Sequence, residues 1–449
     1  MTLPAETRDR YLAAFERVGG SRKDRPLWLR RLREDALARF LETGFPTVKH
    51  EDWKYTGLAS IEQGDFETAE PGGGDLSPAD IAGILPGEEA DRHVLVFLNG
   101  RYRPELSIRR PLPPGAHLGS LTGALGGEFD GLVPYFSRSK ETAFTDLNTM
   151  LMEDGVFLHL AKDVRVPEPV HLLFLMSPTA RPVMAHPRNL IIAGENSGVT
   201  VVEQYAGRGD SGYFVNSVTD IAAGRNATIA HYRLQEEGPA ACHVAALRSR
   251  QGAGSRFAAH SASFGALLSR HDIHAVLDGE GAECMLNGLY LGSGRQHVDH
   301  FTTIDHAKPS GVSREYYNGI LNDRARGVFR GRLIVRRDAQ KTDARQTNRN
   351  LLLSRESEAD SRPQLEIHAD DVKCTHGATV GPLDEEKVFY MRSRGIDEAS
   401  AKALLTYAFA DDILKRFELP GLRRTLERKL LSWLPEAHRV QEFLHETGI

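Results

Sequence analysis

The chain has 449 residues, which at roughly 150 residues per domain favours about three domains, and 41% of its residues are apolar. Its 61 acidic and 56 basic residues leave a formal net charge of -5, so composition gives no electrostatic reason to expect nucleic acid or a membrane surface as a partner. Three cysteines are too few, and odd in number, for a disulfide framework, and no apolar run approaches the roughly 18 residues that span a bilayer; we therefore expect a cytoplasmic protein.

Residues 1–92 are expected to form an N-terminal helical region and a linker. Within 26–46, apolar side chains recur at helical spacing: Leu29, Leu32, Ala36, Leu37 and Phe40. The charged side chains expected on the opposite, exposed face are Arg30, Arg31, Arg33 and Glu34. The helix should end at Gly44 and Pro46, because glycine accepts a left-handed cap and proline cannot continue a helix.

Residues 93–382 are rich in short apolar runs separated by Gly and Asn, which is typical of strands joined by turns. Glycine-rich turns recur about 30 residues apart or slightly less, at Gly194, Gly224, Gly254 and Gly281. This period, with strands and no helical crossovers, favours a β-helix in which each coil buries one face on its neighbours. A large β-sandwich or barrel is the alternative. The sequence does not decide whether each period forms one large coil or two flattened coils.

Residues 383–449 are predicted to form a C-terminal helical domain. Asp397 is placed to cap the first turn of a helix that Pro420 would end. The apolar stripe expected along this helix is Ala401, Leu404, Leu405, Ala408 and Phe409. The second helix should present an apolar stripe of four leucines: Leu422, Leu426, Leu430 and Leu434.

Several strong signatures of chemistry are absent from the sequence. No Gly-Lys dipeptide occurs, so a Walker A loop is missing and we expect the chain itself to bind no nucleotide. The HExxH and CxxC patterns are also absent, which removes the usual zinc and redox motifs.

One histidine-rich stretch, RQHVDHFTTIDH at 295–306, invites a metal-site interpretation. Strand alternation sends His297 and Asp299 to one face of a strand and His300 to the other. A single face therefore collects few ligands, and a metal site would need more from neighbouring coils. The simpler interpretation is a solenoid strand whose polar side chains point outward.

The stretch ADDVKCTHGATVG at 369–381 carries a cysteine and a histidine two residues apart. Strand alternation is expected to place five side chains on one face: His368, Asp370, Val372, Cys374 and His376. Thiolate and imidazole suit a soft metal or an iron–sulfur species, and an imidazole can also activate a thiol. The third option is a small buried Cys beside an edge His. Because two ligands do not complete a four-coordinate site, a metal here would need further ligands.

Five segments of the sequence resemble the SufB/SufD family of iron–sulfur cluster assembly proteins, and most of all its SufD branch. They are GFPTVKHEDWKYT at 44–56, VDHFTTIDH at 298–306, YYNGILNDRARGVFRGRLIV at 316–335, DARQTNRNLLLS at 343–354, and the long stretch 363–414 that contains DDVKCTHGATVG. The likeness covers most of the chain.

The resemblance implies a mainly β fold, in which a right-handed parallel β-helix over residues 93–382 is flanked by N-terminal and C-terminal helical regions. It implies a scaffold subunit that is not an enzyme. Such a subunit pairs with a SufB-like subunit through its β-helix and docks a SufC-like ATPase through its C-terminal helices. A transient iron–sulfur cluster would be shared with the SufB-like subunit, and whether a reduced flavin binds the complex stays open.

The KCxH motif of the family falls on Cys374 and His376. The resemblance implies that both residues lie at the subunit interface, where they would take part in cluster formation and could serve as metal ligands shared with the partner. Thr375 stands where serine is common, which is a conservative difference.

Two other functions stay open at this point. A β-helix enzyme acting on a polysaccharide would use the many acidic and basic residues of the chain, although such enzymes are usually secreted and the N-terminus has no apolar signal core. A homodimeric adaptor without cluster chemistry is the other alternative, since the isolated chain could pair its β-helix edge with a second copy.

Overall fold

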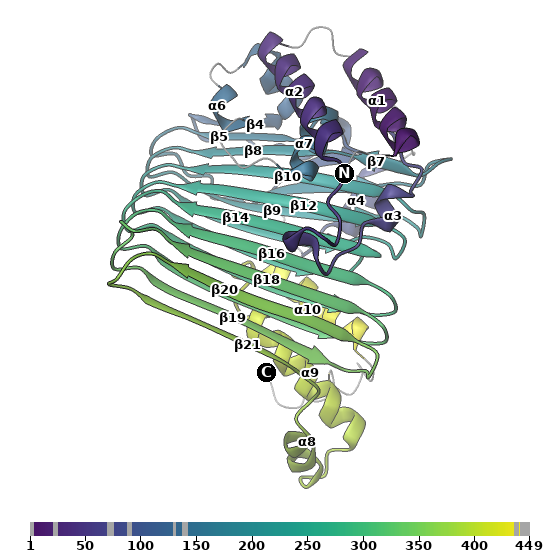
Figure 1. Ribbon diagram of the computed structural model, residues 1–449, viewed down its shortest axis with the longest axis vertical. Helices are drawn as coiled ribbons and strands as arrows, with labels where there is room; N and C mark the ends of the chain where they lie inside the picture. Colours follow the sequence, from purple (N-terminus) through teal and green to yellow (C-terminus); the bar gives the residue numbers. More distant parts are fainter. Residues whose placement is uncertain are drawn as a thin grey trace.

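The computed structural model describes residues 4–20, 26–69, 76–87, 92–128, 132–136, 142–434 and 440, and it is dominated by strands. Figure 1 shows the strands stacked into a tall solenoid, with the first helices of the chain at the top and the last ones toward the bottom. The solenoid has about eight turns.

Two sheets form the walls of the solenoid. In order along the stack, the first sheet contains β4 (Ala116–Ser120), β5 (Val156–Leu160), β8 (Arg188–Ala193), β10 (Phe214–Ala223), β12 (Cys242–Gln251), β14 (Leu268–Leu277), β16 (His297–His306), β18 (Arg326–Val335) and β20 (Glu358–Ile367), with β7 (Val183–Ala185) and β1 (Glu67–Thr68) beside β10. The second sheet contains β3 (Arg101–Tyr102), β2 (His93–Leu98), β6 (Val170–Met176), β9 (Gly198–Gly207), β11 (Thr228–Glu236), β13 (Arg256–Ser263), β15 (Glu283–Gly292), β17 (Val312–Leu321), β19 (Asp343–Leu352) and β21 (Lys373–Gly381).

From β8 onward, consecutive strands lie on opposite sheets, and each strand pairs in parallel with the strand two places further along the chain. Each period of the sequence is therefore one coil of two long strands, as the pairing of Leu268 with His297 in the next coil illustrates. The parallel ladders confirm the predicted β-helix, because a sandwich or barrel of this strand order would need antiparallel pairs. Inward rows such as Ile304 and Leu333, one above the other, fill the interior.

Turn residues in the left-handed region recur at one corner of the coils. They are Asn196, Asn226, Gly254 and Gly281, with φ of 58°, 54°, 64° and 67°. The Asn226 amide nitrogen donates to the Asn196 side-chain oxygen at 3.1 Å, so the corners bond to each other along the stack. Gly194 and Gly224 keep ordinary φ. A Cβ at Gly224 would approach the Glu195 backbone nitrogen to 2.9 Å, so close contact between coils explains that glycine.

The N-terminal helices cover the outer face of the first sheet. They are α1 (Ala5–Gly20), α2 (Leu27–Thr43), η1 (Glu51–Trp53) and α3 (Ala59–Glu62), joined by α7 (Ala143–Leu151) from inside the β-rich region. An apolar cluster that includes Phe40, Trp53 and Phe144 packs them against Phe214 and Leu268 of the sheet. Short helical elements complete this part of the chain: α4 (Pro78–Ile84), η2 (Pro104–Leu106), α5 (Leu121–Gly123), η3 (Ala124–Glu128) and α6 (Val133–Phe136).

The helix predicted in 26–46 is confirmed as α2. Gly44 caps it with φ 65°, and its backbone N–H donates to the Phe40 carbonyl. One residue departs from the expected exposed face: Arg33 is buried, and its Nε donates to the Met150 carbonyl of α7 at 3.0 Å. The amphipathic pattern was wrong there because α2 packs on α7 as well as on the sheet.

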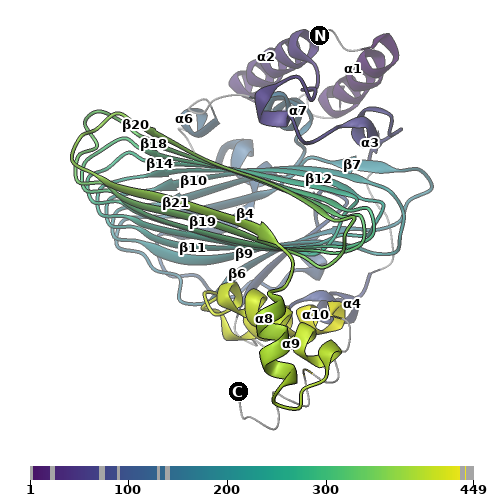
Figure 2. The ribbon, with the colours of Figure 1, turned by 60° about the horizontal axis from the view of Figure 1, so that its bottom comes forward.

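Of the three C-terminal helices, α9 (Glu398–Leu414) and α10 (Pro420–Trp433) lie against the outer face of the second sheet, and α8 (Glu385–Arg392) packs on α9. Figure 2 shows them on the side of the solenoid opposite to α1 and α2. Asp397 caps α9 through hydrogen bonds from the backbone of Ala399 and Ser400, as predicted. All four leucines expected along the second helix are buried in one apolar cluster, three of them within α10 and Leu434 as its C-cap.

The apolar stripe predicted for α9 was partly wrong. Its buried residues are Ser400, Ala401, Ala403, Thr406, Ala410, Ile413 and Leu414. Ala408 is exposed instead, because α9 contacts α10 on one side and strands β15 and β17 on another. Within the described ranges, no helix combines the length and the apolar character needed to cross a membrane.

Candidate functional site

The solenoid ends at strands β20 and β21, and the described residues leave this end open. β20 pairs with β18 alone and β21 with β19 alone, so each last strand has one edge without a strand partner in the described chain. Figure 2 brings this end of the molecule forward. Seven of the nine residues of β21 are exposed, whereas a strand inside the stack such as β15 is largely buried. An exposed strand edge of this length is a template for pairing with another chain.

Cys374 and His376 lie on β21, on the face that continues the interior of the solenoid. Their register partners on β19 are the buried residues Ala344 and Gln346. Cys374 is half-buried and packs against the apolar core, while His376 is exposed at the open end. The predicted placement of both residues on one strand face is therefore confirmed, and both sit where a second chain would cover them.

The environment of the Cys374 thiol disfavours the thiolate. Burial raises its pKa, the nearby Asp343 carboxylate raises it further, and a hydrogen bond from the Ala344 backbone opposes both effects. The imidazole two residues away does not reverse this shift. The site thus lacks the depressed thiol pKa of an activated nucleophile.

Three of the five residues predicted to share this face do not lie on the strand. β20 ends at Ile367 and β21 begins at Lys373, so His368, Asp370 and Val372 belong to the turn between them. The alternation of a strand does not extend through this turn. The same-face set at the open end is therefore reduced to Cys374 and His376.

This pair does not form a complete metal site within the described part of the chain. No group of three or more His, Cys, Asp or Glu side chains there is arranged to hold a metal ion. All three cysteines of the chain are free thiols, and Cys242 and Cys284 are buried far from the open end in sequence. The residues present could supply one thiol and one imidazole, with the remaining ligands coming from another molecule.

The histidine-rich strand β16 has a different role. His297 and Asp299 face outward and His300 faces inward, as alternation predicted, but the outward pair is covered by the N-terminal segment. The hydroxyl of Thr56 donates to Asp299 Oδ2 at 2.5 Å and contacts His297 Nε2 at 3.0 Å. Arg270 pairs with the same Asp299 carboxylate at 2.5 Å. His297 and Asp299 therefore contact a segment of the chain rather than face solvent.

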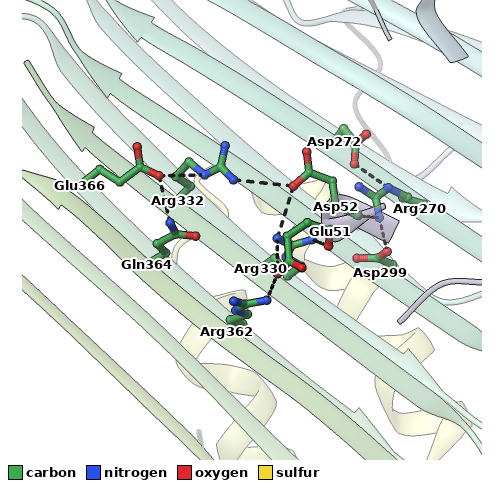
Figure 3. A network of polar contacts seen from close by, with 10 residues as sticks. All are labelled: Glu51, Asp52, Arg270, Asp272, Asp299, Arg330, Arg332, Arg362, Gln364 and Glu366. Atoms are coloured by element: carbon green, nitrogen blue, oxygen red, sulfur yellow. Dashed lines mark hydrogen bonds and ion pairs between the residues drawn. The ribbon is translucent and has the colours of Figure 1, made fainter. Parts of the chain in front are cut away.

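Figure 3 shows how this docking extends toward the open end. Arg270 stacks on the Trp53 ring, with its guanidinium carbon 3.8 Å from the ring centroid. Asp52 lies 3.3 Å from a guanidinium nitrogen of Arg330 on β18, and Glu51 pairs with Arg362 on β20. This EDWKYT segment, residues 51–56, is part of the likeness to the SufB/SufD family, which implies no role for it. The contacts of Glu51, Asp52 and Trp53 hold the N-terminal region against the coils that contain Arg270, Arg330 and Arg362, and we call this set of contacts the clamp.

The chain matches two family models over almost its whole length. Residues 174–409 match the family described as "SUF system FeS cluster assembly, SufBD core domain", and residues 6–172 match the "SufBD protein N-terminal region". The boundary between the two matches falls within β6.

Three curated relatives illustrate the likeness. The chain is 34% identical, over 85% of its length and 86% of the relative, to an iron–sulfur cluster assembly SufBD family protein of Synechocystis. It is 32% identical to the iron–sulfur cluster assembly protein SufD of Escherichia coli, over 90% of this chain and 92% of that one. It is 25% identical to SufD of Bacillus subtilis, over 94% and 97% of the two chains.

Proposed function

Since this chain belongs to the SufBD family of iron–sulfur cluster assembly proteins, we propose that it is the SufD-like scaffold subunit of a complex that also contains a SufB-like subunit and a SufC-like ATPase. In this role it performs no catalysis of its own. It presents one half of an interface at which a transient iron–sulfur cluster, the cargo of the system, is formed.

One observation carries this proposal: the solenoid is open where Cys374 and His376 lie. A β-helix whose last strands keep unpaired edges is suited to continue its ladders into a second β-helix. A SufB-like partner that docks there would bury the inner face of β21. It would bring its own ligands to the thiol and the imidazole, which suit iron–sulfur species.

The C-terminal helices offer the docking surface for the ATPase. Phe389 and Tyr390 of α8 are 72% and 57% exposed, which is unusual for large aromatic side chains outside an interface. Phe389 lines a pocket of about 680 Å³ between α8, α9 and the end of the solenoid, together with Leu383 and Lys402, and Tyr390 is its neighbour on α8. Aromatic side chains that rim a pocket are typical anchors of protein interfaces.

We place this subunit in the cytoplasm, because its sparse, unpaired cysteines fit a reducing compartment. A homodimer is the second arrangement that the open end allows, since its exposed edges could pair with a second copy. If the homodimer is the functional form, adding the SufB-like subunit to this protein would leave the homodimer intact.

The proposal is tested with the complex of all three subunits purified after co-expression. We expect Cys374→Ala and His376→Ala each to leave the stoichiometry of the complex unchanged and to lower the bound iron and sulfide several-fold, with loss of the cluster's visible absorption. Thr375→Ala is the matched control, because Thr375 lies between them on the opposite strand face and is exposed. Unchanged iron and sulfide in both variants would contradict the interface role.

A further inference from the structure

A column of side chains leads from the solenoid interior to His376. Strand pairing in the second sheet aligns Glu315 with Gln346 and Gln346 with His376, one residue from each of the last three coils. In parallel strands, aligned residues on the same face stand about 4.8 Å apart and pack on each other. The imidazole of His376 is thus the exposed end of a column whose other members are buried.

The Gln346 amide is held in one orientation. Its nitrogen Nε2 donates to Glu315 Oε2 at 2.6 Å, and both side chains are buried, with 2% and 0% of their surface exposed. Gly331 on the opposite wall makes room for the amide, since a Cβ there would lie 1.9 Å from Nε2. Because the amide nitrogen of Gln346 donates to the Glu315 carboxyl group, the amide oxygen points elsewhere and needs a separate hydrogen-bond donor.

That amide oxygen lacks a partner. Gln346 Oε1 is buried and accepts no hydrogen bond from any described residue. A buried acceptor without a donor is unfavourable, so this oxygen calls for a donor that the described chain does not supply. The next polar side chain in the column is the imidazole of His376, whose N–H group is a donor.

We infer that Gln346 is a positioning residue for His376: when a partner covers the open end, an imidazole N–H of His376 donates to the oxygen Oε1 of Gln346, whose amide Glu315 holds in place. This inference rests on the proposed function. The hydrogen bond fixes which ring nitrogen carries the proton and leaves the other, unprotonated nitrogen directed at the interface. Histidines that bind metals are oriented in this way by the acceptor behind them.

The test uses the co-expressed complex and two linked measurements. The first is cluster content from bound iron and sulfide. The second is the ¹⁴N coupling of an imidazole ligand in pulsed EPR spectra of the reduced cluster, identified by its loss in His376→Ala. We expect Gln346→Met, which keeps the volume and removes the acceptor, to change this coupling and to lower cluster content by about 10-fold, the usual scale for an oriented ligand that loses its support.

Two further variants make the test specific. The exchange Glu315→Gln with Gln346→Glu again pairs an amide with a carboxylate and again offers an oxygen to His376, so it should restore the coupling and the cluster content. Gln364→Met is the matched control, because Gln364 lies on β20 with its amide bonded to Glu366 on the outer face of the last coil. It should behave like the wild type.

The outcomes separate the inference from the proposed function. If neither Cys374→Ala nor His376→Ala lowers the cluster content, the proposed function fails and the inference fails with it. If His376→Ala abolishes both while Gln346→Met leaves both at wild-type values, the function stands and the inference is overturned. If Gln346→Met does not fold, the exchange variant decides: it must show the wild-type coupling, and its failure to do so overturns the inference.

Discussion

At the scale of single residues, burial rather than charge pairing sets the properties of the open end. It raises the pKa of the Cys374 thiol and, two coils deeper, raises the pKa of the Glu315 carboxyl to about 7. Under the proposed function, a metal that binds Cys374 would have to displace the thiol proton, because the thiolate is the ligand.

The Glu315 carboxyl makes stability depend on pH. The folded chain holds its proton up to about pH 7, whereas the unfolded chain loses it near 4.5, so this group lowers the free energy of unfolding as the pH rises between these values. The substitution Glu315→Gln keeps a side-chain oxygen that accepts from the Gln346 amide and removes the ionisable carboxyl group. We expect it to match the wild type near pH 4.5 and to be more stable by up to about 3 kcal/mol at pH 8, measured by urea unfolding.

The comparison should be made against an exposed carboxyl. Glu356→Gln, in the turn before β20, changes the same chemical group where solvent reaches it. A stability difference that widens with pH for Glu315→Gln and stays flat for Glu356→Gln supports the assignment. Parallel pH profiles for wild type and Glu315→Gln would show that the carboxyl ionises freely in the folded chain.

At the scale of elements, the segment 44–58 fastens the N-terminal helices to coils far away in the sequence. Trp53 is buried between Phe144 of α7 and the guanidinium of Arg270 on β14, and Arg270 is in turn paired with Asp272 and Asp299. A fully buried guanidinium needs both carboxylates and the aromatic face. The segment thereby couples the position of the N-terminal region to the coils that end the solenoid.

Trp53→Ala should open this clamp without unfolding the solenoid. Removing a buried tryptophan costs about 3–5 kcal/mol, so we expect amide hydrogen exchange in 44–58 to speed up by about 100-fold or more, while strands β9 to β17 keep their protection. The measurement is hydrogen exchange followed by mass spectrometry. Lys54→Ala, an exposed neighbour in the same segment, should leave exchange unchanged. Faster exchange throughout the solenoid in Trp53→Ala would mean that the segment is part of the core.

At the scale of the whole molecule, the solenoid separates three surfaces. The N-terminal helices cover one face, the C-terminal helices cover the opposite face, and the open end lies between them (Figure 2). α10 buries Leu422, Leu426 and Leu430 against the second sheet, so deleting it would expose a broad apolar patch of the solenoid. Substitutions on the surface of α8 are therefore the cleaner probe of ATPase docking.

Phe389→Ser combined with Tyr390→Ser should weaken binding of the SufC-like ATPase by at least about 10-fold, because exposed aromatic anchors carry much of the affinity of an interface. The melting temperature and the pairing with the SufB-like subunit should not change, since neither side chain is in a core. Binding is measured by calorimetry with the purified ATPase. Ile108→Ala, an exposed apolar side chain distant in the sequence, is the control. Unchanged affinity in the double variant would move the docking surface away from α8.

The sequence by itself determined the features that depend on neighbours along the chain: the coil period, the caps of α2 and α9 at Gly44 and Asp397, and the shared strand face of Cys374 and His376. The tertiary structure alone decided how the helices pack and which residues of stacked coils align. Helix packing buried Arg33 and redirected the faces of α9, and the strand register set Gln346 beneath His376. These contacts join residues on different elements, whereas helix propensity and strand alternation describe only neighbours a few residues apart and so cannot predict them.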